Sequence, residues 1–213
     1  MCLTPHIKRK SKLSVISLFP TALGVYKLNR LLYPEEINFT LQCFNSKVFT
    51  GTNCISNDTF ILNSKEMSAI RAFIENSIDQ YLKEVDPFPN NTSLYITQSW
   101  FTFTEKEQYH HIHNHPNSYL SGVLYFNVDP DSGKIFFKNP KIRELLIEKS
   151  RYTPFNSDEW SITPEVGTLL LFPSYIEHYV KDYQGSKPRV SLAFNTFIKG
   201  QLGSERALTD LKL

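Results

Sequence analysis

The sequence has few cysteines, little glycine and no long hydrophobic run. Its 3 cysteines among 213 residues are widely spaced and form no paired motif, which fits a reducing compartment. Glycine is also scarce, with 8 residues against roughly 7% in average usage. The longest apolar runs, Leu13–Phe19 and Gly167–Phe172, fall far short of the roughly 18 residues that span a bilayer. We therefore expect no integral membrane protein.

Dense charge of one sign occurs only at residues 8–12, Lys-Arg-Lys-Ser-Lys. An apolar stretch follows, as in a secretory signal, but Ser14, Ser17 and Pro20 interrupt it. We therefore expect no signal peptide and a cytoplasmic protein. With 23 basic and 21 acidic residues the net charge is +2, which argues against general affinity for nucleic acid. The basic run is interpreted as a solvated terminus, with a small phosphate-binding arm as the alternative.

Aromatic residues are plentiful, with 16 Phe, 11 Tyr and 2 Trp, and they favour β-structure. One helix is predicted over Lys65–Val85, where apolar residues recur at steps of three and four. Asn63 or Ser64 would cap it. Strands are predicted at 14–19, 24–28, 39–44, 59–62, 94–104, 119–128, 133–138, 167–172, 176–180 and 189–198.

The predicted strands do not alternate with helices, so a doubly wound parallel sheet is not expected. Many short strands separated by turn-forming residues favour an antiparallel sandwich or barrel. We expect one domain over 1–213, with N-terminal strands and a supporting helix in 1–92, a β-core in 93–198 and a tail in 199–213. Residues 141–150 have a mixed helical pattern, inside an excursion that runs to Pro164.

Four of the 6 histidines fall within six positions, at 110, 111, 113 and 115, and His178 follows on a later predicted strand. Side chains two apart on a strand share a face, so His111, His113 and His115 would point to one side and His110 away from them. Pro116 ends the strand there. A His-x-His pair with a distant third histidine supplies three imidazole ligands and leaves other positions open for reaction. The spacing therefore predicts a metal site, without deciding which two of the three clustered histidines bind.

Several segments in order carry a further signal: Ser99-Trp100, His113–Ser118, Ser121–Phe126, Gly167–Pro173, His178 and Arg189–Asn195. Together they resemble the 2-oxoglutarate/Fe(II)-dependent oxygenase family frequent in marine bacteria and their phages. The resemblance covers roughly residues 94–198 and implies a double-stranded β-helix, a jelly-roll or cupin-like barrel with flanking helices. It also implies Fe(II) as the metal, 2-oxoglutarate as the cosubstrate and, for a phage protein, the host cytoplasm as the location.

Carried over by position, the resemblance makes His113 the first metal ligand and His178 the distal one. Arg189 would bind the distal carboxylate of 2-oxoglutarate, with Ser191 and Tyr125 beside it. The residues support this independently, because Arg189 and Ser191 lie two apart on one predicted strand and a guanidinium can bind a carboxylate bidentately. By the same alternation Ala193 and Asn195 face inward, while Val190, Leu192 and Phe194 pack outward beneath a helix.

The sequence departs from the superfamily at residue 115, where a histidine replaces the carboxylate ligand. Three neutral ligands would leave the metal more electrophilic and could strengthen binding of a dianionic cosubstrate, or shift selectivity towards Zn or Cu. Alternatively, His115 turns away, and a water, an unrecognised acidic residue or His111 completes the site. We expect an oxygenase that hydroxylates a small-molecule, amino-acid or peptide substrate and releases succinate. The alternatives are a three-histidine dioxygenase without 2-oxoglutarate, or a non-catalytic metal- or ligand-binding barrel; a homodimer is left open.

Overall fold

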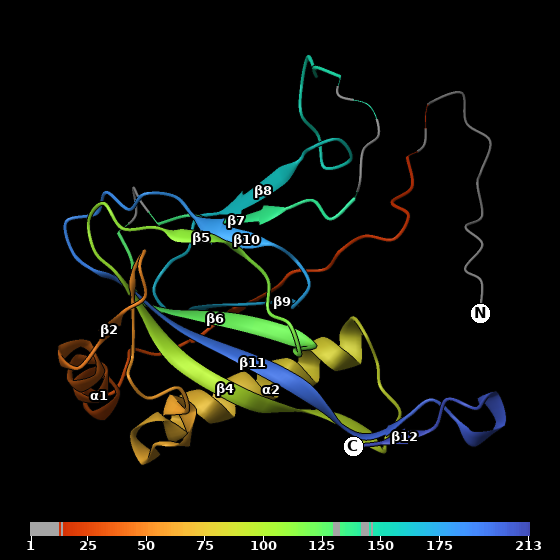
Figure 1. Ribbon diagram of the computed structural model, residues 1–213, viewed down its shortest axis with the longest axis horizontal. Coiled ribbons are helices and arrows are strands. Elements are labelled where there is room, and N and C mark those ends of the chain that lie inside the picture. The colour runs from red at the N-terminus through yellow and green to blue at the C-terminus, as the bar shows by residue number, and fades with distance from the viewer. Residues whose placement is uncertain (1–12, 14, 130–132, 142–144, 146) are drawn as a thin grey trace.

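Two antiparallel sheets lie one above the other, and helices cover the outer face of the larger sheet (Figure 1). The computed structural model describes residues 13, 15–129, 133–141, 145 and 147–213. Within them, the prediction of a mainly β protein with flanking helices is confirmed. No helix in these residues is long and apolar enough to cross a membrane.

The larger sheet follows the order β1 (Gly24–Lys27), β9 (Thr168–Pro173), β6 (Leu120–Asn127), β11 (Arg189–Leu202), β4 (Thr92–Thr104), β3 (Cys54–Ile55) and β2 (Val48–Phe49), and β12 (Leu211–Lys212) pairs with β11. The smaller sheet follows the order β5 (His110–His113), β10 (His178–Val180), β7 (Ile135–Lys138) and β8 (Glu159–Ile162). Every pair of neighbouring strands is antiparallel.

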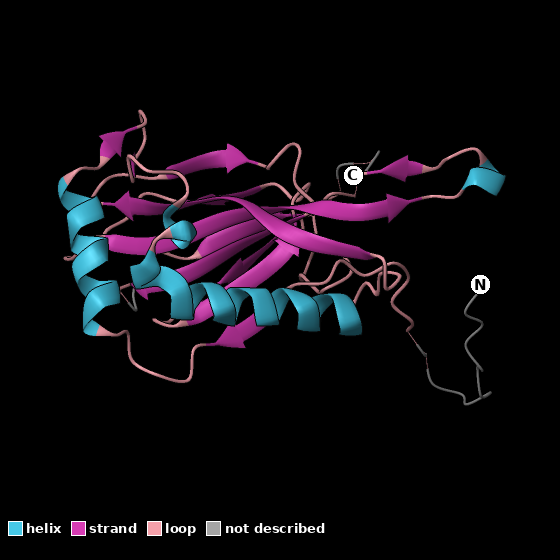
Figure 2. Ribbon diagram, turned by 90° about the horizontal axis from the view of Figure 1, so that it is seen from below, coloured by secondary structure: helices cyan, strands magenta, loops and turns pink. Residues whose placement is uncertain are grey.

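The predicted long helix forms as α2 (Ser68–Glu84), after short 3-10 turns at Ile61–Asn63 and Lys65–Met67. It runs across the strands of the larger sheet (Figure 2). Its buried apolar side chains are Ile70, Ile74, Ile78, Tyr81 and Leu82. Each such burial stabilises the fold by roughly 1.5–3 kcal/mol. This contact fixes which face of the sheet is turned away from the barrel interior.

The strand predicted at 39–44 is wrong, because these residues lie in α1 (Pro34–Asn45). The aromatic and β-branched residues of the segment favoured a strand, but the helix start has strong signals of its own. Pro34 occupies the first turn, where its missing N–H costs nothing. The Glu36 carboxylate accepts a hydrogen bond from the Tyr33 backbone N–H at 2.7 Å. It also pairs with Arg30.

Three further expectations differ from the structure. Residues 15–19 form no strand, and residue 14 is outside the described residues. The segment predicted as a strand at 59–62 is largely a 3-10 turn. The helix expected over 141–150 is absent from the described part of that range, whereas 142–144 and 146 lie outside it. The excursion instead contributes β8, which extends the smaller sheet beside β7.

The alternation along β11 divides its side chains between two environments. Val190, Leu192 and Phe194 belong to the core that contains the α2 residues, as the sequence predicts. A second core cluster lies between the two sheets and includes Tyr125, Phe137 and Phe172. Arg189 and Ser191 point to this inner side, so the charged and polar groups of the strand face the barrel interior.

Candidate metal centre

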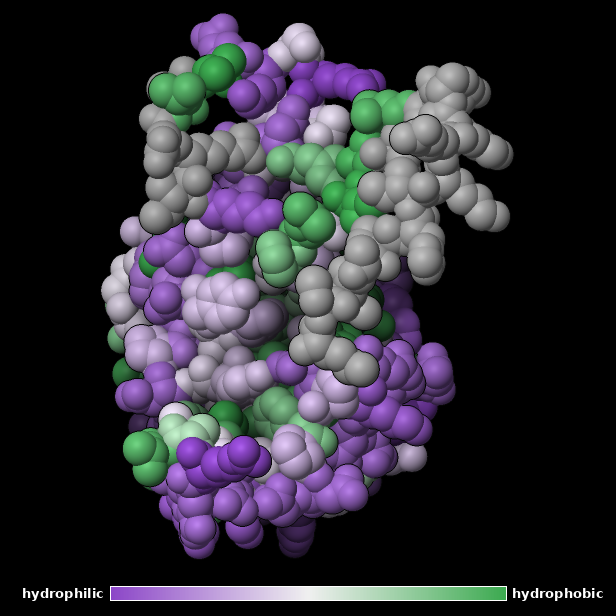
Figure 3. Space-filling view, turned by 90° about the vertical axis from the view of Figure 1, so that its right-hand side faces the viewer, coloured by the Kyte–Doolittle hydropathy of each residue, from purple (hydrophilic) through white to green (hydrophobic). Residues whose placement is uncertain are grey.

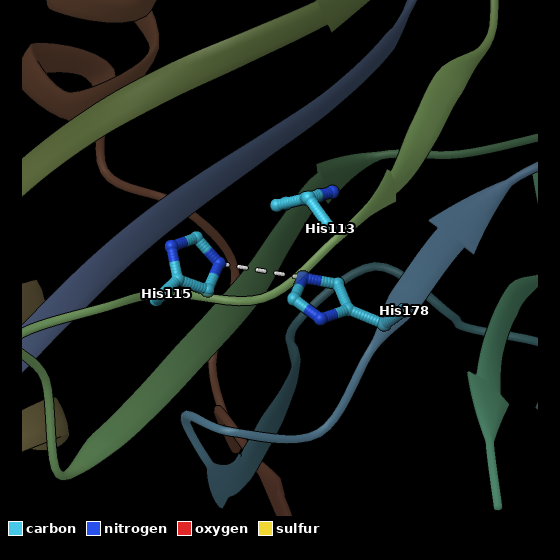
Figure 4. Close-up of side chains that lie close together, drawn as sticks. All are labelled: His113, His115 and His178. Carbon is cyan, nitrogen blue, oxygen red and sulfur yellow. Dashed lines mark hydrogen bonds between the residues drawn. The ribbon is translucent and has the colours of Figure 1, made fainter.

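Three histidines from two segments meet at one end of the smaller sheet (Figure 4). His113 ends β5 and His178 begins β10, and the two residues are direct partners across the antiparallel pair. Their ring centroids are 4.3 Å apart. His115 follows β5 in a loop that is held by a backbone hydrogen bond from its N–H to the Ser174 carbonyl, at 3.0 Å.

The ligand atoms of the three residues, one nitrogen from each ring, all lie within 4.8 Å of one another. The Nε2 atoms of His115 and His178 face each other at 3.4 Å (Figure 4). With metal–nitrogen distances of about 2.0–2.1 Å, two ligands at a tetrahedral angle would be about 3.4 Å apart. The separation therefore fits two imidazoles on one ion.

Backbone carbonyls fix the tautomers of two of these rings. His113 Nδ1 lies 2.8 Å from the His111 carbonyl oxygen, and His178 Nδ1 lies 3.0 Å from that of Ile176. A carbonyl oxygen only accepts hydrogen bonds, so Nδ1 carries the proton in both rings and Nε2 presents a lone pair. This is the outer support that metal-binding histidines commonly have. The local backbone thus prepares the rings to bind metal.

Burial keeps the three imidazoles neutral. Desolvation, with a smaller contribution from His113, lowers the pKa of His115 to about 4. The same two causes lower the pKa of His178 to about 3, against a weak opposing effect of the Ile176 carbonyl. Desolvation also lowers the pKa of His113. Because only a neutral imidazole has a lone pair for a metal, the site is in its binding form at neutral pH.

The donor set consists of imidazoles alone. Among the described residues, no Asp or Glu oxygen joins the group that could hold an ion. Nitrogen ligands of this kind suit Fe, Zn, Cu and Ni. The residues present therefore fit an Fe(II) ion, with His115 at the position where the superfamily has a carboxylate.

His110 and His111 lie differently from the sequence prediction. His111 is exposed and is not part of the three-histidine group. His110, expected to face away, stacks on the His113 ring with centroids 4.3 Å apart and an interplanar angle of 25°. The register between β5 and β10 is irregular between His178 and Val180, which breaks simple alternation. His110 is therefore beside the metal ligands and was missed as a site residue.

A second polar cluster surrounds the buried guanidinium of Arg189, which is 2% exposed. Its Nη1 donates to the Ser191 hydroxyl at 3.1 Å, and its Nη2 donates to the Tyr125 hydroxyl at 3.4 Å. Its Nε donates to the Gly133 carbonyl at 3.3 Å. Burial raises the pKa of Tyr125, an effect that the positive charge of Arg189 opposes. The two hydroxyls accept from Arg189 and keep their own protons free to donate.

No carboxylate neutralises Arg189 within the part of the chain that the structure describes. A buried guanidinium without an acidic partner is costly, and an anionic ligand would compensate it. A carboxylate matches its planar fork, with two hydroxyl groups alongside. The Arg189, Ser191 and Tyr125 cluster is therefore suited to a carboxylate ligand.

Two neighbours connect this cluster to the histidines. The His110 ring stacks on that of His113, and burial, followed by the nearby His113 and Arg189, lowers the pKa of His110. On the other side, Tyr125 belongs to the same apolar cluster as Phe172. The Phe172 ring lies 4.8 Å from that of His178. The metal ligands and the arginine therefore line one interior.

A groove of about 730 Å³ lies beside this interior, walled by residues 16–23 and by the excursion after β7. Its side chains are mainly apolar and include Phe137, Phe155, Trp160 and Phe172. Apolar side chains gather in the upper half of the face shown in Figure 3. Phe172, which lines the groove, has its ring centroid 4.8 Å from that of His178. Trp160, on β8 of the excursion, lines the groove.

Comparison with protein families gives one match. Residues 98–195, slightly less than half of the chain, match the family model described as "Putative 2OG-Fe(II) oxygenase". This range contains the histidines at positions 110, 111, 113 and 115, as well as His178 and the residues around Arg189. No curated protein matches the chain in sequence.

Solved structures share the fold at low identity. HygX from Streptomyces hygroscopicus, solved with nickel, 2-oxoglutarate and hygromycin B, is 13% identical, with a TM-score of 0.57 and 83% of each chain covered. A Pseudomonas putida prolyl-4-hydroxylase is 14% identical, with a TM-score of 0.54 over 82% of this chain and 92% of its own. The carbocyclase SnoK from nogalamycin biosynthesis is 9% identical, with a TM-score of 0.60; the match covers 83% of this chain and 79% of SnoK. These likenesses confirm the predicted double-stranded β-helix.

Proposed function

We propose that the 2-oxoglutarate- and Fe(II)-dependent oxygenase indicated by the family match and the fold hydroxylates a C–H bond of a small organic substrate. In the balanced reaction, substrate, O₂ and 2-oxoglutarate give hydroxylated substrate, succinate and carbon dioxide. The observation that carries the proposal is the combination of three convergent imidazole nitrogens with a buried arginine that has no acidic partner among the described residues.

In this proposal His113, His115 and His178 hold Fe(II) through one nitrogen each. When bound, Fe(II) and 2-oxoglutarate together supply the oxidising chemistry, in which the cosubstrate is decarboxylated as O₂ is reduced. Arg189 pairs with the distal carboxylate, and the protons of Ser191 and Tyr125 donate to it. Three neutral ligands leave the full ionic charge to attract a dianionic cosubstrate, which favours its binding.

The remaining residues of the chain orient the reactants and exclude water. The hydrogen bonds from the His113 and His178 Nδ1 atoms to backbone carbonyls stop the rings from turning. Phe172 and Phe137 shield the inner side of His178, with ring centroids 4.8 and 6.1 Å from it. A dry, fixed site directs oxidation to the bound substrate rather than to the protein or solvent.

The apolar groove is the proposed substrate site, because its inner wall includes the Phe172 ring that contacts His178. Its aromatic walls suit a substrate with an apolar portion, and Lys138 and Glu159 at the same groove offer charged contacts. HygX carries hygromycin B in its structure, and other neighbours are prolyl hydroxylases, so the fold accommodates both small molecules and proline residues. For this chain we favour a small molecule or a short peptide.

A histidine at position 115, in place of the expected carboxylate, favours one alternative function. This is a three-histidine dioxygenase that needs no 2-oxoglutarate. The two functions differ in their dependence on Arg189. Under the leading proposal, Arg189→Ala abolishes 2-oxoglutarate decarboxylation while Fe(II) still binds. Under the alternative, the same variant retains its metal-dependent oxygen consumption. Measuring succinate formation and oxygen uptake on the same samples separates the two.

A further inference from the structure

The three buried side-chain atoms that lack a hydrogen-bond partner among the described residues all lie in one place. They are Thr52 Oγ1, Asn53 Nδ2 and Thr104 Oγ1. Thr104 is 0% exposed and Asn53 is 1% exposed. Buried polar groups are nearly always paired, so such a concentration calls for an explanation. An unpaired buried donor or acceptor costs about 1–3 kcal/mol.

The strand register places these groups beside Arg189. Thr104, at the end of β4, is the direct partner of Arg189 on β11. On the other side of β4, Cys54 pairs with Phe103, so Asn53 lies next to Thr104. Cys54 and Phe103 both face the core under the helices. By alternation, Asn53 and Thr104 face the barrel interior, as Arg189 does.

The surroundings form the closed end of the interior. The Tyr109 backbone N–H donates to the Thr52 carbonyl at 3.2 Å, which brings the start of β5 over this corner. Gly133, whose carbonyl accepts from Arg189, covers the guanidinium from another side. The corner therefore combines one cation with buried polar side-chain groups that have no hydrogen-bond partner among the described residues. Such a set of groups is suited to an anion.

We propose that Thr104 and Asn53 extend the Arg189 cluster and bind the distal carboxylate of 2-oxoglutarate. With the ligand bound, the Thr104 hydroxyl donates to the carboxylate and turns its oxygen towards Asn53 Nδ2, which then donates to it; the structure shows neither atom with a partner among the described residues. The Asn53 side chain is already oriented from the other end, because its Oδ1 accepts from the Thr50 hydroxyl at 2.9 Å. A hydroxyl can accept one hydrogen bond while donating another, so both unpaired groups are satisfied at once.

This inference rests on the proposed use of 2-oxoglutarate, and a binding measurement tests it. Wild-type protein and variants are titrated anaerobically with 2-oxoglutarate after loading with Fe(II), and affinity is read from calorimetry. Thr104→Val removes the hydroxyl at nearly constant volume and should weaken 2-oxoglutarate about tenfold, the effect of losing one hydrogen bond to a charged group. Thr104→Ser keeps the hydroxyl and should restore the affinity. Asn53→Asp should weaken binding further, because its carboxylate competes for Arg189.

The melting temperature of the ligand-free protein is the second readout. Because Thr104 Oγ1 has no hydrogen-bond partner among the residues that the structure describes, Thr104→Val should leave this temperature unchanged or raise it. The matched control is Thr168→Val on β9, where the buried hydroxyl accepts a hydrogen bond from the Glu165 N–H at 3.3 Å. That variant should melt lower and bind 2-oxoglutarate as wild type does.

The outcomes separate the inference from the function beneath it. If wild type binds 2-oxoglutarate and depends on Arg189, but Thr104→Val and Asn53→Asp bind it equally well, the inference is wrong and the proposed function stands. If Thr104→Val melts lower with unchanged affinity, Thr104 has a structural role only. If wild type does not bind 2-oxoglutarate at all, the proposed function and the inference both fail.

Discussion

His113 and His178 are direct partners across β5 and β10, and each donates its Nδ1 proton to a nearby backbone carbonyl. This relationship ties the metal site to the sheet itself. The strand pairing sets the distance between the rings, and the backbone sets which nitrogen is free. His115 then joins from the loop after β5, with its Nε2 3.4 Å from that of His178. The predictions below follow from this arrangement.

His115→Ala should weaken Fe(II) binding by at least about tenfold, because even the loss of an outer-shell partner of a metal ligand typically costs 10–100-fold. Calorimetric titration with Fe(II) under anaerobic conditions measures this. The matched control is His111→Ala, in the same cluster but exposed and outside the ligand group, which should bind as wild type does. Equal affinities of wild type and His115→Ala would show that residue 115 is not a ligand.

His115→Asp would place a carboxylate where the superfamily has one. We expect Fe(II) binding to recover relative to His115→Ala, because an anionic oxygen ligand replaces the imidazole. The added negative charge should at the same time weaken the binding of the dianionic cosubstrate. Parallel titrations with metal and with 2-oxoglutarate measure the two effects; the prediction fails if both affinities move in the same direction.

Arg189→Met should lose 2-oxoglutarate binding by at least about 100-fold, since a buried charged hydrogen-bonding partner of the ligand is removed. The ligand-free variant should be at least as stable as wild type, because an apolar chain of similar length replaces a buried cation that has no acidic partner in the described part of the chain. Calorimetry and thermal denaturation measure the two quantities. A large drop in melting temperature would contradict the proposed role, since it would mean that Arg189 serves the fold.

Gly133→Ala should disturb the arginine without touching the metal. Gly133 has a φ of +80°, and an added Cβ would lie 3.0 Å from Arg189 Cδ. Residues with a side chain rarely adopt a backbone conformation with positive φ, so the substitution should strain the loop and displace the guanidinium. Weaker 2-oxoglutarate binding with unchanged Fe(II) affinity is the expected result, and Gly51→Ala, which also has a positive φ but meets no atom within 4 Å, is the control.

Trp160→Ala tests the substrate groove. Trp160 is 52% exposed and lines the groove beyond Phe172. Once a substrate is found by screening, its KM should rise in this variant, while 2-oxoglutarate turnover without substrate should not change. Tyr152→Ala, in the same excursion but not among the groove residues, is the control. A rise in the KM for 2-oxoglutarate instead would place Trp160 on the cosubstrate side.

Much of the site could be predicted from local pattern. The spacing predicted a metal site with two of His111, His113 and His115 together with His178, and the family resemblance singled out His113 and His178. Alternation on one strand was enough to put Arg189 and Ser191 on the inner face. Alternation failed at His110, because the chain leaves β4 at Thr104, turns, and enters the other sheet with an irregular register. The strand predicted at 39–44 was wrong for another reason. The aromatic and β-branched residues of this segment favoured a strand, whereas Pro34 and Glu36 start the helix α1.

Other parts of the site depend on tertiary pairing that no local pattern contains. Asn53 and Thr104 are 51 residues apart and meet only because β3 pairs with β4. Gly133 reaches Arg189 through the fold alone, and nothing near it in sequence indicates this contact. The groove likewise joins residues 16–23 to the excursion after β7. These features became visible only with the arrangement of the two sheets.

The proposed function is tested most directly by an anaerobic titration of the wild-type protein and of Arg189→Ala, first with Fe(II) and then with 2-oxoglutarate, followed by visible spectroscopy. Both proteins should bind Fe(II). Wild type alone should then develop the metal-to-ligand charge-transfer band as 2-oxoglutarate is added. A wild-type protein that binds Fe(II) but shows no band, or an Arg189→Ala variant with the same band at the same concentrations, would contradict it.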